Sequence, residues 1–232
     1  MRTRLCLAGA AAAAIAASAS ADFSGFVADS YAVDALGNMV DFGDATYAVI
    51  DLYAEFAAPN TEGFDNADST VLNVFGASIA RAGGGDFIHN DAGGGSWNPL
   101  FSGLGADPAA IDSFVTIGGI GGVTESTGLD PNFAGGVGGT IPVGAGWFNQ
   151  NPPNLQGAVD GELRTFIGRF VISTADAAAG ESLDVSASLS YNYGIGTGSF
   201  FADGSGSFAY VPAPGALALL GLGGLAARRR RG

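Results

Sequence analysis

An alternation of apolar and polar residues constrains the fold of this chain more than any other feature of its sequence. In residues 183–193, LDVSASLSYNY, leucine, valine, alanine and tyrosine take every odd position, and aspartate, serine and asparagine take every even one. Successive side chains of a β-strand point to opposite faces, so a period of two predicts a strand with one buried and one solvated face.

Six further segments are predicted as strands: residues 23–33, 46–56, 70–80, 113–117, 163–173 and 208–211, the last after a turn at Asp203-Gly204. A helix is the alternative for residues 46–56, but their valine, isoleucine and tyrosine content favours a strand. Short helical turns are predicted only at residues 107–112, with Asp107 as the cap and Pro108 in the first position, and at 175–179.

Strands without intervening helices predict an all-β domain over residues 22–210. We expect antiparallel pairing and a two-sheet β-sandwich, either jelly-roll or immunoglobulin-like. A β-helix is the alternative, but the chain shows no sustained repeat. Two long glycine-rich loops, residues 83–112 and 118–161, are expected between strands, and loops of that length often carry function.

Two glycine clusters share a GGxGG pattern, at residues 118–122 and 135–139. A phosphate-binding loop would end in a Gly-Lys-Ser/Thr motif, and the chain contains no lysine. Calcium-binding repeats of the GGxGxD type need an aspartate that is also missing from the pattern. The clusters therefore indicate turns, where glycine adopts positive φ without steric cost.

Residues 1–21 have the pattern of a secretory signal peptide, which would form an N-terminal signal helix. Arg2 and Arg4 precede an apolar run at residues 5–17, and small residues at 19–21 offer a cleavage site. An uncleaved anchor is the alternative, but the run is shorter than the roughly 20 residues that cross a bilayer. Cys6, the only cysteine, lies in this segment, so the exported chain would lack disulfides, thiolate metal sites and a cysteine nucleophile.

The predicted domain is strongly acidic. All 22 acidic residues of the chain lie in residues 22–210 together with three arginines, which gives this segment a formal charge of −19. Such a charge repels phosphate backbones and anionic lipid headgroups, so we expect no nucleic-acid partner. Solubility is the simpler explanation for the carboxylates, and attraction of divalent cations is the alternative.

Calcium is the one cofactor that the sequence leaves open. Glu62, Asp65 and Asp68 lie close together and provide oxygen ligands, but without the full spacing of an EF-hand. A glycan hydrolase would need only two carboxylates, and no pair stands out among 22 acidic residues. We therefore predict no catalytic residues and a non-enzymatic protein, with hydrolysis as the alternative.

His89 is the only histidine of the chain. It could form a mixed metal site with Asp86 and Asp91, but ordinary hydrogen bonding in a loop is the favoured interpretation. A serine hydrolase is not indicated, because no Gly-x-Ser-x-Gly motif occurs.

The two tryptophans have similar neighbours. Trp97 is followed by Asn98 and Trp147 by Phe148 and Asn149, with a proline soon after each. An indole that stacks on a sugar ring beside amide hydrogen-bonding groups would bind carbohydrate, so Trp97, Asn98, Trp147 and Asn149 are candidate glycan-binding residues. The alternative is that each indole is buried in the domain.

The last 22 residues, VPAPGALALLGLGGLAARRRRG, differ in composition from the rest of the chain. Their apolar run at residues 215–227 would form a short C-terminal apolar helix of about 20 Å, against a hydrocarbon core of about 30 Å. Eight of these 13 residues are glycine or alanine, which lowers the hydrophobicity of the run. As a permanent transmembrane helix the segment is therefore poor.

Pro212 and Pro214, the apolar run and the terminal cluster together resemble the PEP-CTERM sorting signal, also labelled the ice-binding protein C-terminal domain. The cluster consists of Arg228, Arg229, Arg230 and Arg231. Ala213 stands where the family name has glutamate. The resemblance implies export by the Sec machinery of a Gram-negative bacterium, transient anchoring in the inner membrane, cleavage near the prolines by an exosortase, and association with exopolysaccharide and biofilm matrix.

These observations predict three segments: a signal peptide at residues 1–21, an acidic β-domain at 22–210 and a sorting signal at 211–232. We expect an exported cell-surface or extracellular-matrix protein with a structural or adhesive role that includes carbohydrate binding. The alternatives are a secreted glycan hydrolase and a surface protein whose tail remains as a membrane anchor.

Overall fold

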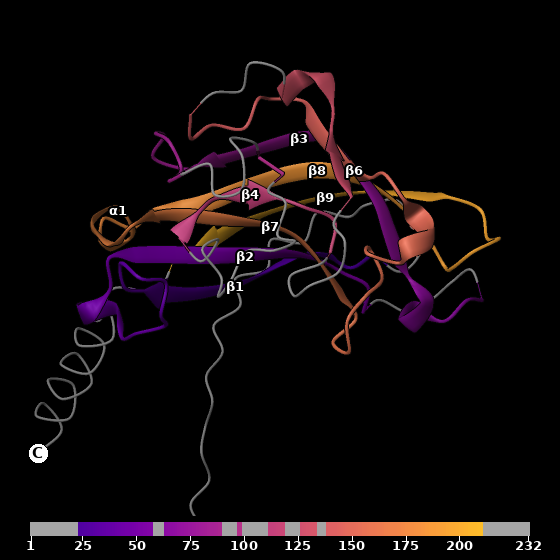
Figure 1. Cartoon of the computed structure of the whole chain (residues 1–232), viewed down its shortest axis with the longest axis horizontal. Helices are drawn as coiled ribbons and strands as arrows, with labels where there is room; N and C mark the ends of the chain where they lie inside the picture. The colour runs from indigo at the N-terminus through magenta and orange to yellow at the C-terminus, as the bar shows by residue number, and fades with distance from the viewer. Residues whose placement is uncertain are drawn as a thin grey trace, which may run out of the picture.

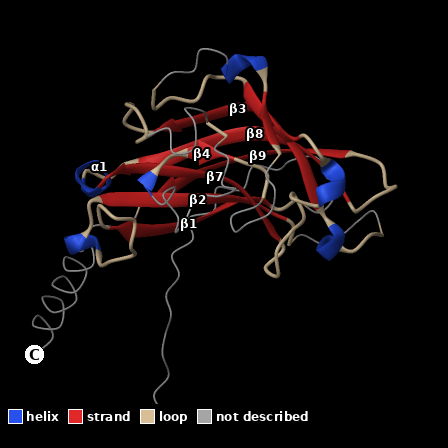
Figure 2. Cartoon of the chain, viewed as in Figure 1, coloured by secondary structure: helices blue, strands red, loops and turns tan. Residues whose placement is uncertain are grey.

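The computed structural model describes residues 23–57, 63–89, 97–98, 111–118, 126–133 and 138–210. The predicted signal peptide, the predicted sorting signal and most of the predicted helical turn at residues 107–112 lie outside these ranges. Figures 1 and 2 show long strands that run across the molecule and short helices at the ends of the strands.

Over the residues that the structure describes, the chain is mostly β-structure and forms two antiparallel sheets. Sheet A has the strand order β1-β2-β7-β4, and sheet B has the order β5-β6-β3-β8-β9. The strands are β1 Gly25–Val33, β2 Tyr47–Glu55, β3 Thr70–Arg81, β4 Phe114–Val115, β5 Thr127–Leu129, β6 Ala145–Asn149, β7 Arg164–Ser173, β8 Ser182–Asn192 and β9 Phe200–Ala209.

The period-two pattern that predicted β8 is confirmed. Leu183, Val185 and Leu189 are buried, and Asp184 and Ser186 between them are exposed. In the same way β2 is a strand rather than a helix, paired with β1 on one side and β7 on the other. Its valine and isoleucine content fits its burial, because residues 48–52 are buried one after another, on both faces of sheet A.

Helices are short in the described part of the chain. They are α1 Thr174–Ala178 and the 3-10 turns η1 Phe42–Asp44, η2 Asn66–Asp68, η4 Pro131–Phe133 and η5 Pro152–Asn154. The side chain of Ser173 caps α1 by accepting the Asp176 N–H at 3.1 Å. Among the residues that the structure places, no helix is long and apolar enough to span a bilayer.

One hydrophobic cluster joins the facing sides of the two sheets. Ile50 and Leu52 of sheet A belong to the same cluster as Val74, Leu189 and Tyr191 of sheet B. Each of these side chains is at most 1 % exposed. The inner face of each sheet therefore supplies half of a common core, and the opposite faces remain for other contacts.

The predicted turn at Asp203-Gly204 is wrong. Both residues lie inside β9, where Asp203 pairs with Ser188 and Gly204 pairs with Ala187. A Cβ atom at Gly204 would lie 2.8 Å from the ring of Phe23 and 2.9 Å from that of Phe26. Glycine is present here because two aromatic rings occupy the place of its side chain, and the reversal of the chain lies earlier, where Gly194 and Gly196 have positive φ.

The prediction that residues 118–161 form one long loop is also wrong, because β5 and β6 lie within them. Gly118 and Gly138 do have positive φ, as predicted for the glycine clusters. Close packing is the second use of glycine here, since a Cβ at Gly139 would lie 2.0 Å from the backbone oxygen of Phe87.

Candidate functional site

The outer face of sheet B carries an open hollow of about 300 Å³. It is lined by Asn73, Val74, Phe75, Asp130, Gly146, Trp147, Phe148 and Phe201. Seven of these residues belong to β3, β6 and β9, and the eighth, Asp130, directly follows β5. Segments far apart in sequence thus meet on one surface.

Three phenylalanines on this face are exposed to solvent. Phe201 is 62 % exposed, Phe75 40 % and Phe148 36 %. The rings of Phe75 and Phe201 meet edge to face, with centroids 6.4 Å apart and planes at 78°. Isolated exposed apolar residues are normal on a protein, but three aromatic side chains around one hollow form a surface suited to binding.

Strand register explains why these rings gather. Phe148 pairs with Asn73, Asn73 pairs with Ser190, and Ser190 pairs with Phe201, so the four lie in one row across the sheet. Paired residues on neighbouring strands point to the same face. The two rings therefore stand on the same side of sheet B, separated by the small side chains of β3 and β8.

A β-bulge places the third ring. The registers of β3 with β6 and with β8 both shift just after Val74 or Phe75. Gly76 lies in this interruption with φ of 62°, in the left-handed region that glycine adopts without strain. The bulge ends regular pairing beside Phe75, as bulges commonly do next to binding sites.

Two glycines make room for the hollow. Gly146 forms part of its lining, and a Cβ there would lie 3.0 Å from Oδ2 of Asp130 and 3.3 Å from Cα of Phe75. At Gly128, a Cβ would lie 2.6 Å from Cζ of Phe148. The Phe148 ring therefore lies over the backbone of β5, and the space over Gly146 is bordered by the carboxylate of Asp130 and the backbone of Phe75.

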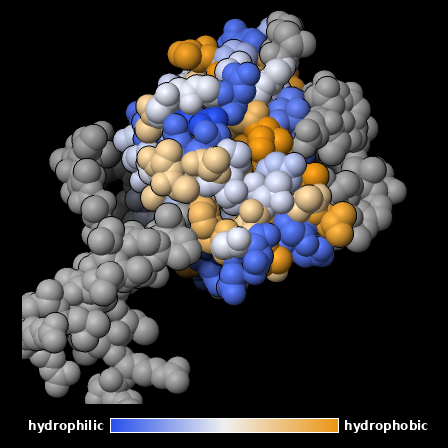
Figure 3. All heavy atoms as spheres, turned by 90° about the vertical axis from the view of Figure 1, so that its left-hand side faces the viewer, coloured by the Kyte–Doolittle hydropathy of each residue, from blue (hydrophilic) through white to orange (hydrophobic). Residues whose placement is uncertain are grey.

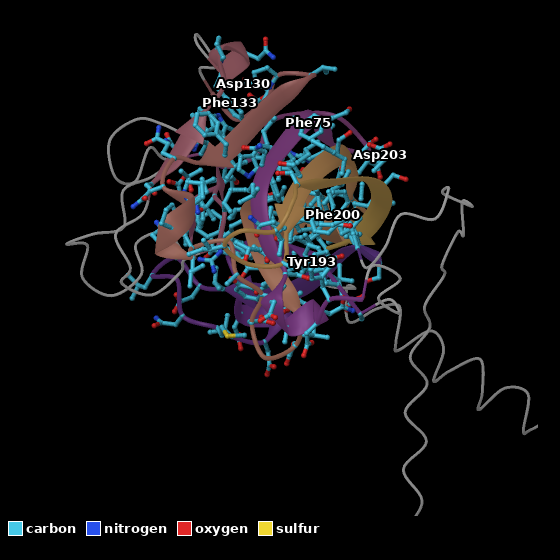
Figure 4. All side chains as sticks on the ribbon, turned by 90° about the vertical axis from the view of Figure 1, so that its right-hand side faces the viewer. Phe75, Asp130, Phe133, Tyr193, Phe200 and Asp203 are labelled. Carbon is cyan, nitrogen blue, oxygen red and sulfur yellow. The ribbon has the colours of Figure 1, made fainter. Side chains whose placement is uncertain are left out.

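Carboxylates and hydroxyls surround the aromatic rings. Asp130 accepts hydrogen bonds from the backbone N–H of Asn132 at 2.9 Å and from Nδ2 of Asn132 at 3.4 Å. On the other side, Ser188 donates to Oδ1 of Asp203 at 2.5 Å. Figure 4 shows Phe75 between Asp130 and Asp203.

Both tryptophans predicted as sugar platforms are buried. Trp97 is 2 % exposed and Trp147 0 %. The Trp147 indole N–H donates to the backbone oxygen of Thr116 at 2.9 Å, which ties β6 to sheet A. Trp97 stacks on His89 with centroids 4.5 Å apart. Burial, the alternative interpretation, describes both residues, and neither indole offers a free face to a sugar.

The two predicted amides also point to structural contacts. Asn98 donates from Nδ2 to the backbone oxygen of Thr127 at 2.6 Å. Asn149 is 5 % exposed and donates from Nδ2 to Oδ1 of Asn154 at 3.1 Å. Gln156 continues this network by donating to the hydroxyl of Thr127 at 2.9 Å. The structure brings the two tryptophan segments near one another, but as parts of the interior.

The predicted calcium ligands are only partly described, since Glu62 lies outside the described residues. Asp65 caps the turn η2 by accepting the backbone N–H of Ala67 at 3.0 Å, and Asp68 is exposed on the same turn. Among the described residues no group of three or more histidine, cysteine or acidic side chains is arranged to hold a metal ion. Calcium binding here stays a prediction.

His89 makes ordinary hydrogen bonds, as favoured from the sequence. Its Nδ1 lies 2.8 Å from the backbone oxygen of Ser113 and 3.3 Å from Oδ1 of Asp112. Arg81 donates to the backbone oxygen of Asp86 at 2.9 Å. Asp91, the other ligand considered for a mixed metal site, lies outside the described residues.

A second hollow, of about 230 Å³, lies near the outer side of sheet A and includes Tyr53, Asp160 and Arg164 in its lining. The Arg164 guanidinium lies 4.4 Å from the centroid of the Tyr53 ring. Burial raises the pKa of the Tyr53 phenol to about 12, and the charges of Asp51 and Asp29 add to the effect. Arg164 also pairs with Asp29 and Glu162, so this hollow has no uncompensated positive charge for an anion.

No family model, no curated protein and no solved structure matches this chain. Its function is therefore argued from its own residues.

Proposed function

We propose that this chain is an exported cell-surface or extracellular-matrix protein whose domain binds glycan, without catalysis, on the outer face of sheet B. The observation that carries the proposal is the group of exposed rings of Phe75, Phe148 and Phe201 around the hollow over Gly146. This site replaces the tryptophan segments as the candidate surface.

The chemistry of the hollow supports a sugar ligand. The C–H groups on one side of a pyranose ring pack well against an aromatic face, and rigid aromatic side chains lose little conformational entropy on binding. Asn73, Asp130 and Asp203 supply polar groups at the borders of the rings. An apolar surface with a few polar groups is the usual composition of a small-molecule site.

The fold and the two ends of the chain complete the proposal. We infer a β-sandwich from the two sheets with their common core. Export rests on the signal-peptide pattern of residues 1–21, and sorting by an exosortase rests on the resemblance of residues 211–232 to the PEP-CTERM signal. A domain with 22 acidic residues and three arginines stays soluble outside the cell by self-repulsion.

Affinity electrophoresis through gels that contain dissolved polysaccharides tests the binding function. A binding glycan retards the protein, and we expect Phe75→Ala and Phe201→Ala each to weaken binding about tenfold, which corresponds to about 1.4 kcal/mol of lost stacking. Phe64→Ala is the matched control, because Phe64 is also 40 % exposed but stacks on Tyr193 outside the hollow.

Two outcomes would contradict the proposal. Equal migration in the presence and absence of every glycan would remove the binding function. Equal weakening by Phe64→Ala and Phe75→Ala would remove the assignment to this hollow. Release of shorter oligosaccharides during the assay would favour the hydrolase alternative.

A further inference from the structure

The positive charges of the domain are all paired with carboxylates. Arg81 lies 3.2 Å from Asp176 and 3.4 Å from Glu181. The other two arginines also make ion pairs: Arg164 with Asp29, Asp160 and Glu162, and Arg169 with Asp51. None of the three lines the hollow on sheet B.

The carboxylates on the outer face of sheet B have a different kind of partner. Asp130 accepts from Asn132, Asp203 from Ser188 at 2.5 Å, and Asp184 from Ser207 at 2.6 Å. Amide and hydroxyl donors fix the orientation of a carboxylate without cancelling its charge. The donors to these three side chains, Asn132, Ser188 and Ser207, carry no positive charge, so this face keeps its negative potential.

Negative charge and aromatic rings together select one kind of glycan. A polymer of uronic acids or sulfated sugars would be repelled by Asp130 and Asp203. A neutral polymer would gain stacking and hydrogen bonds from its hydroxyl groups, without attraction between charges. A protonated amino sugar gains stacking, attraction to the carboxylates, and attraction of its ammonium group to the faces of the phenylalanine rings.

On the basis of the proposed glycan binding, we infer that the ligand of this face is a cationic polysaccharide built from amino sugars with free, protonated amino groups. Its rings pack on Phe75 and Phe201, and its ammonium groups lie near Asp130 and Asp203. Ser188 pairs with Phe75 on one side and with Asp203 on the other, so ring and carboxylate stand on one face, two strands apart. At about 4.8 Å between strands, an extended chain of sugars bridges that distance.

Calorimetric titration of the exported protein with four probes of equal length tests the inference. The probes are a β-1,4-linked glucosamine hexamer, its fully N-acetylated form, a β-1,4-linked glucose hexamer and hexalysine. At low salt and a pH that keeps the amines protonated, we expect the glucosamine hexamer to bind at least tenfold more tightly than the two neutral hexamers. Added salt should reduce this difference by screening.

Variants separate charge from stacking. Asp130→Asn and Asp203→Asn keep the size of each side chain, and together they should remove the preference for glucosamine while leaving the affinity for glucose unchanged. Phe75→Ala should weaken all three sugars. Asp44→Asn is the matched control, since Asp44 is an exposed carboxylate on η1, outside the hollow. Unchanged unfolding midpoints establish that the variants are folded.

The outcomes distinguish this inference from the proposed function. If the neutral hexamers bind as tightly as the glucosamine hexamer, and Phe75→Ala weakens the binding of all three, the inference of a cationic ligand is wrong. The proposal that this face binds glycan would then still stand. If hexalysine binds as tightly as the glucosamine hexamer, and Phe75→Ala leaves the affinity for hexalysine unchanged, the inference is also wrong, because the face would then recognise charge alone. Failure of all three sugars to bind would overturn the proposed function as well.

Discussion

Arg169 donates two hydrogen bonds to Asp51 across neighbouring strands, from Nε to Oδ1 at 2.7 Å and from Nη2 to Oδ2 at 3.0 Å. The two residues are direct partners in the register of β2 with β7. They are 5 % and 6 % exposed, and the hydroxyl of Tyr31 adds a third bond to Oδ2 of Asp51 at 3.1 Å. The outward side of sheet A is therefore buried at this point around a hydrogen-bonded ion pair.

Removing one member of this pair should destabilise the fold strongly. Asp51→Ala leaves a buried guanidinium without its carboxylate, and we expect a loss of about 3–5 kcal/mol in the free energy of unfolding. Replacing both members, as in Asp51→Leu with Arg169→Met, should cost much less than the sum of the single changes. Urea unfolding measures both. Additive losses would show that the two side chains do not depend on each other.

Stability at alkaline pH should depend on Tyr53. Burial raises the pKa of its phenol from the ordinary 10 to about 12, with Asp51 and Asp29 adding to the shift. Folding therefore favours the protonated phenol, so its contribution is complete below pH 10 and is lost between pH 10 and about 12. The absorbance of phenolate measures the titration of the tyrosines with rising pH. In Tyr53→Phe, one tyrosine fewer should ionise at the alkaline end of this titration. An unchanged late titration in that variant would contradict the assignment.

The amide network between β5, β6 and η5 should be structural rather than ligand-binding. Asn154 donates from Nδ2 to Oε1 of Gln156 at 3.2 Å, and that oxygen also accepts the Ser126 N–H at 3.0 Å. Because Gln156 is buried, Gln156→Ala leaves its partners unsatisfied, and we expect a loss of about 1–3 kcal/mol. Glycan affinity of the folded variant should stay unchanged. If Gln156→Ala lost glycan affinity while keeping its stability, the glycan site would have to include the β5 edge of sheet B.

The sequence predicted β8 well because the two faces of this strand have different surroundings along most of its length. β8 alternates because its inner side enters the core and its outer side carries Asp184 and Ser186. β5 and β6 were missed because they are short, and each contains a glycine at a place where another group approaches closely, Gly128 and Gly146. Glycine within a strand has the same appearance in sequence as glycine in a turn.

The candidate site was missed for a related reason. Composition draws attention to tryptophan beside asparagine, but Trp147 is one residue before Phe148, and successive residues of a strand face opposite ways. Trp147 is thus buried and Phe148 exposed. The available signal was an aromatic residue at a solvated position of a strand whose burial alternates, as at Phe201 of β9. That Phe201 stands in the same row as Phe148 follows from register, which a single sequence does not reveal.

Two glycines should differ in how well they tolerate substitution by alanine, although an added Cβ would meet no other atom at either one. Gly76 has φ of 62° in the bulge beside Phe75, whereas Gly161 has no positive φ. Gly76→Ala should therefore cost about 1 kcal/mol in backbone strain, and Gly161→Ala should be neutral or slightly stabilising. Gly76→Ala should also weaken glycan binding by displacing Phe75. Equal stability of the two variants would show that the bulge is not strained by a side chain.

The terminal segments should be absent from the mature surface protein. If residues 211–232 are a sorting signal, mass spectrometry of protein recovered from the surface of a bacterium that has an exosortase should show a chain that begins at Asp22 and ends near Pro212 and Pro214. Replacing Arg228, Arg229, Arg230 and Arg231 by alanine removes the positive charge that holds the tail on the cytoplasmic side. This variant should keep its apolar run and fail to reach the surface, while the single change Arg228→Lys preserves the charge and should be sorted normally. A surface form that still ends in four arginines would mean that the tail is an anchor, and the alternative of an uncleaved membrane protein would then hold.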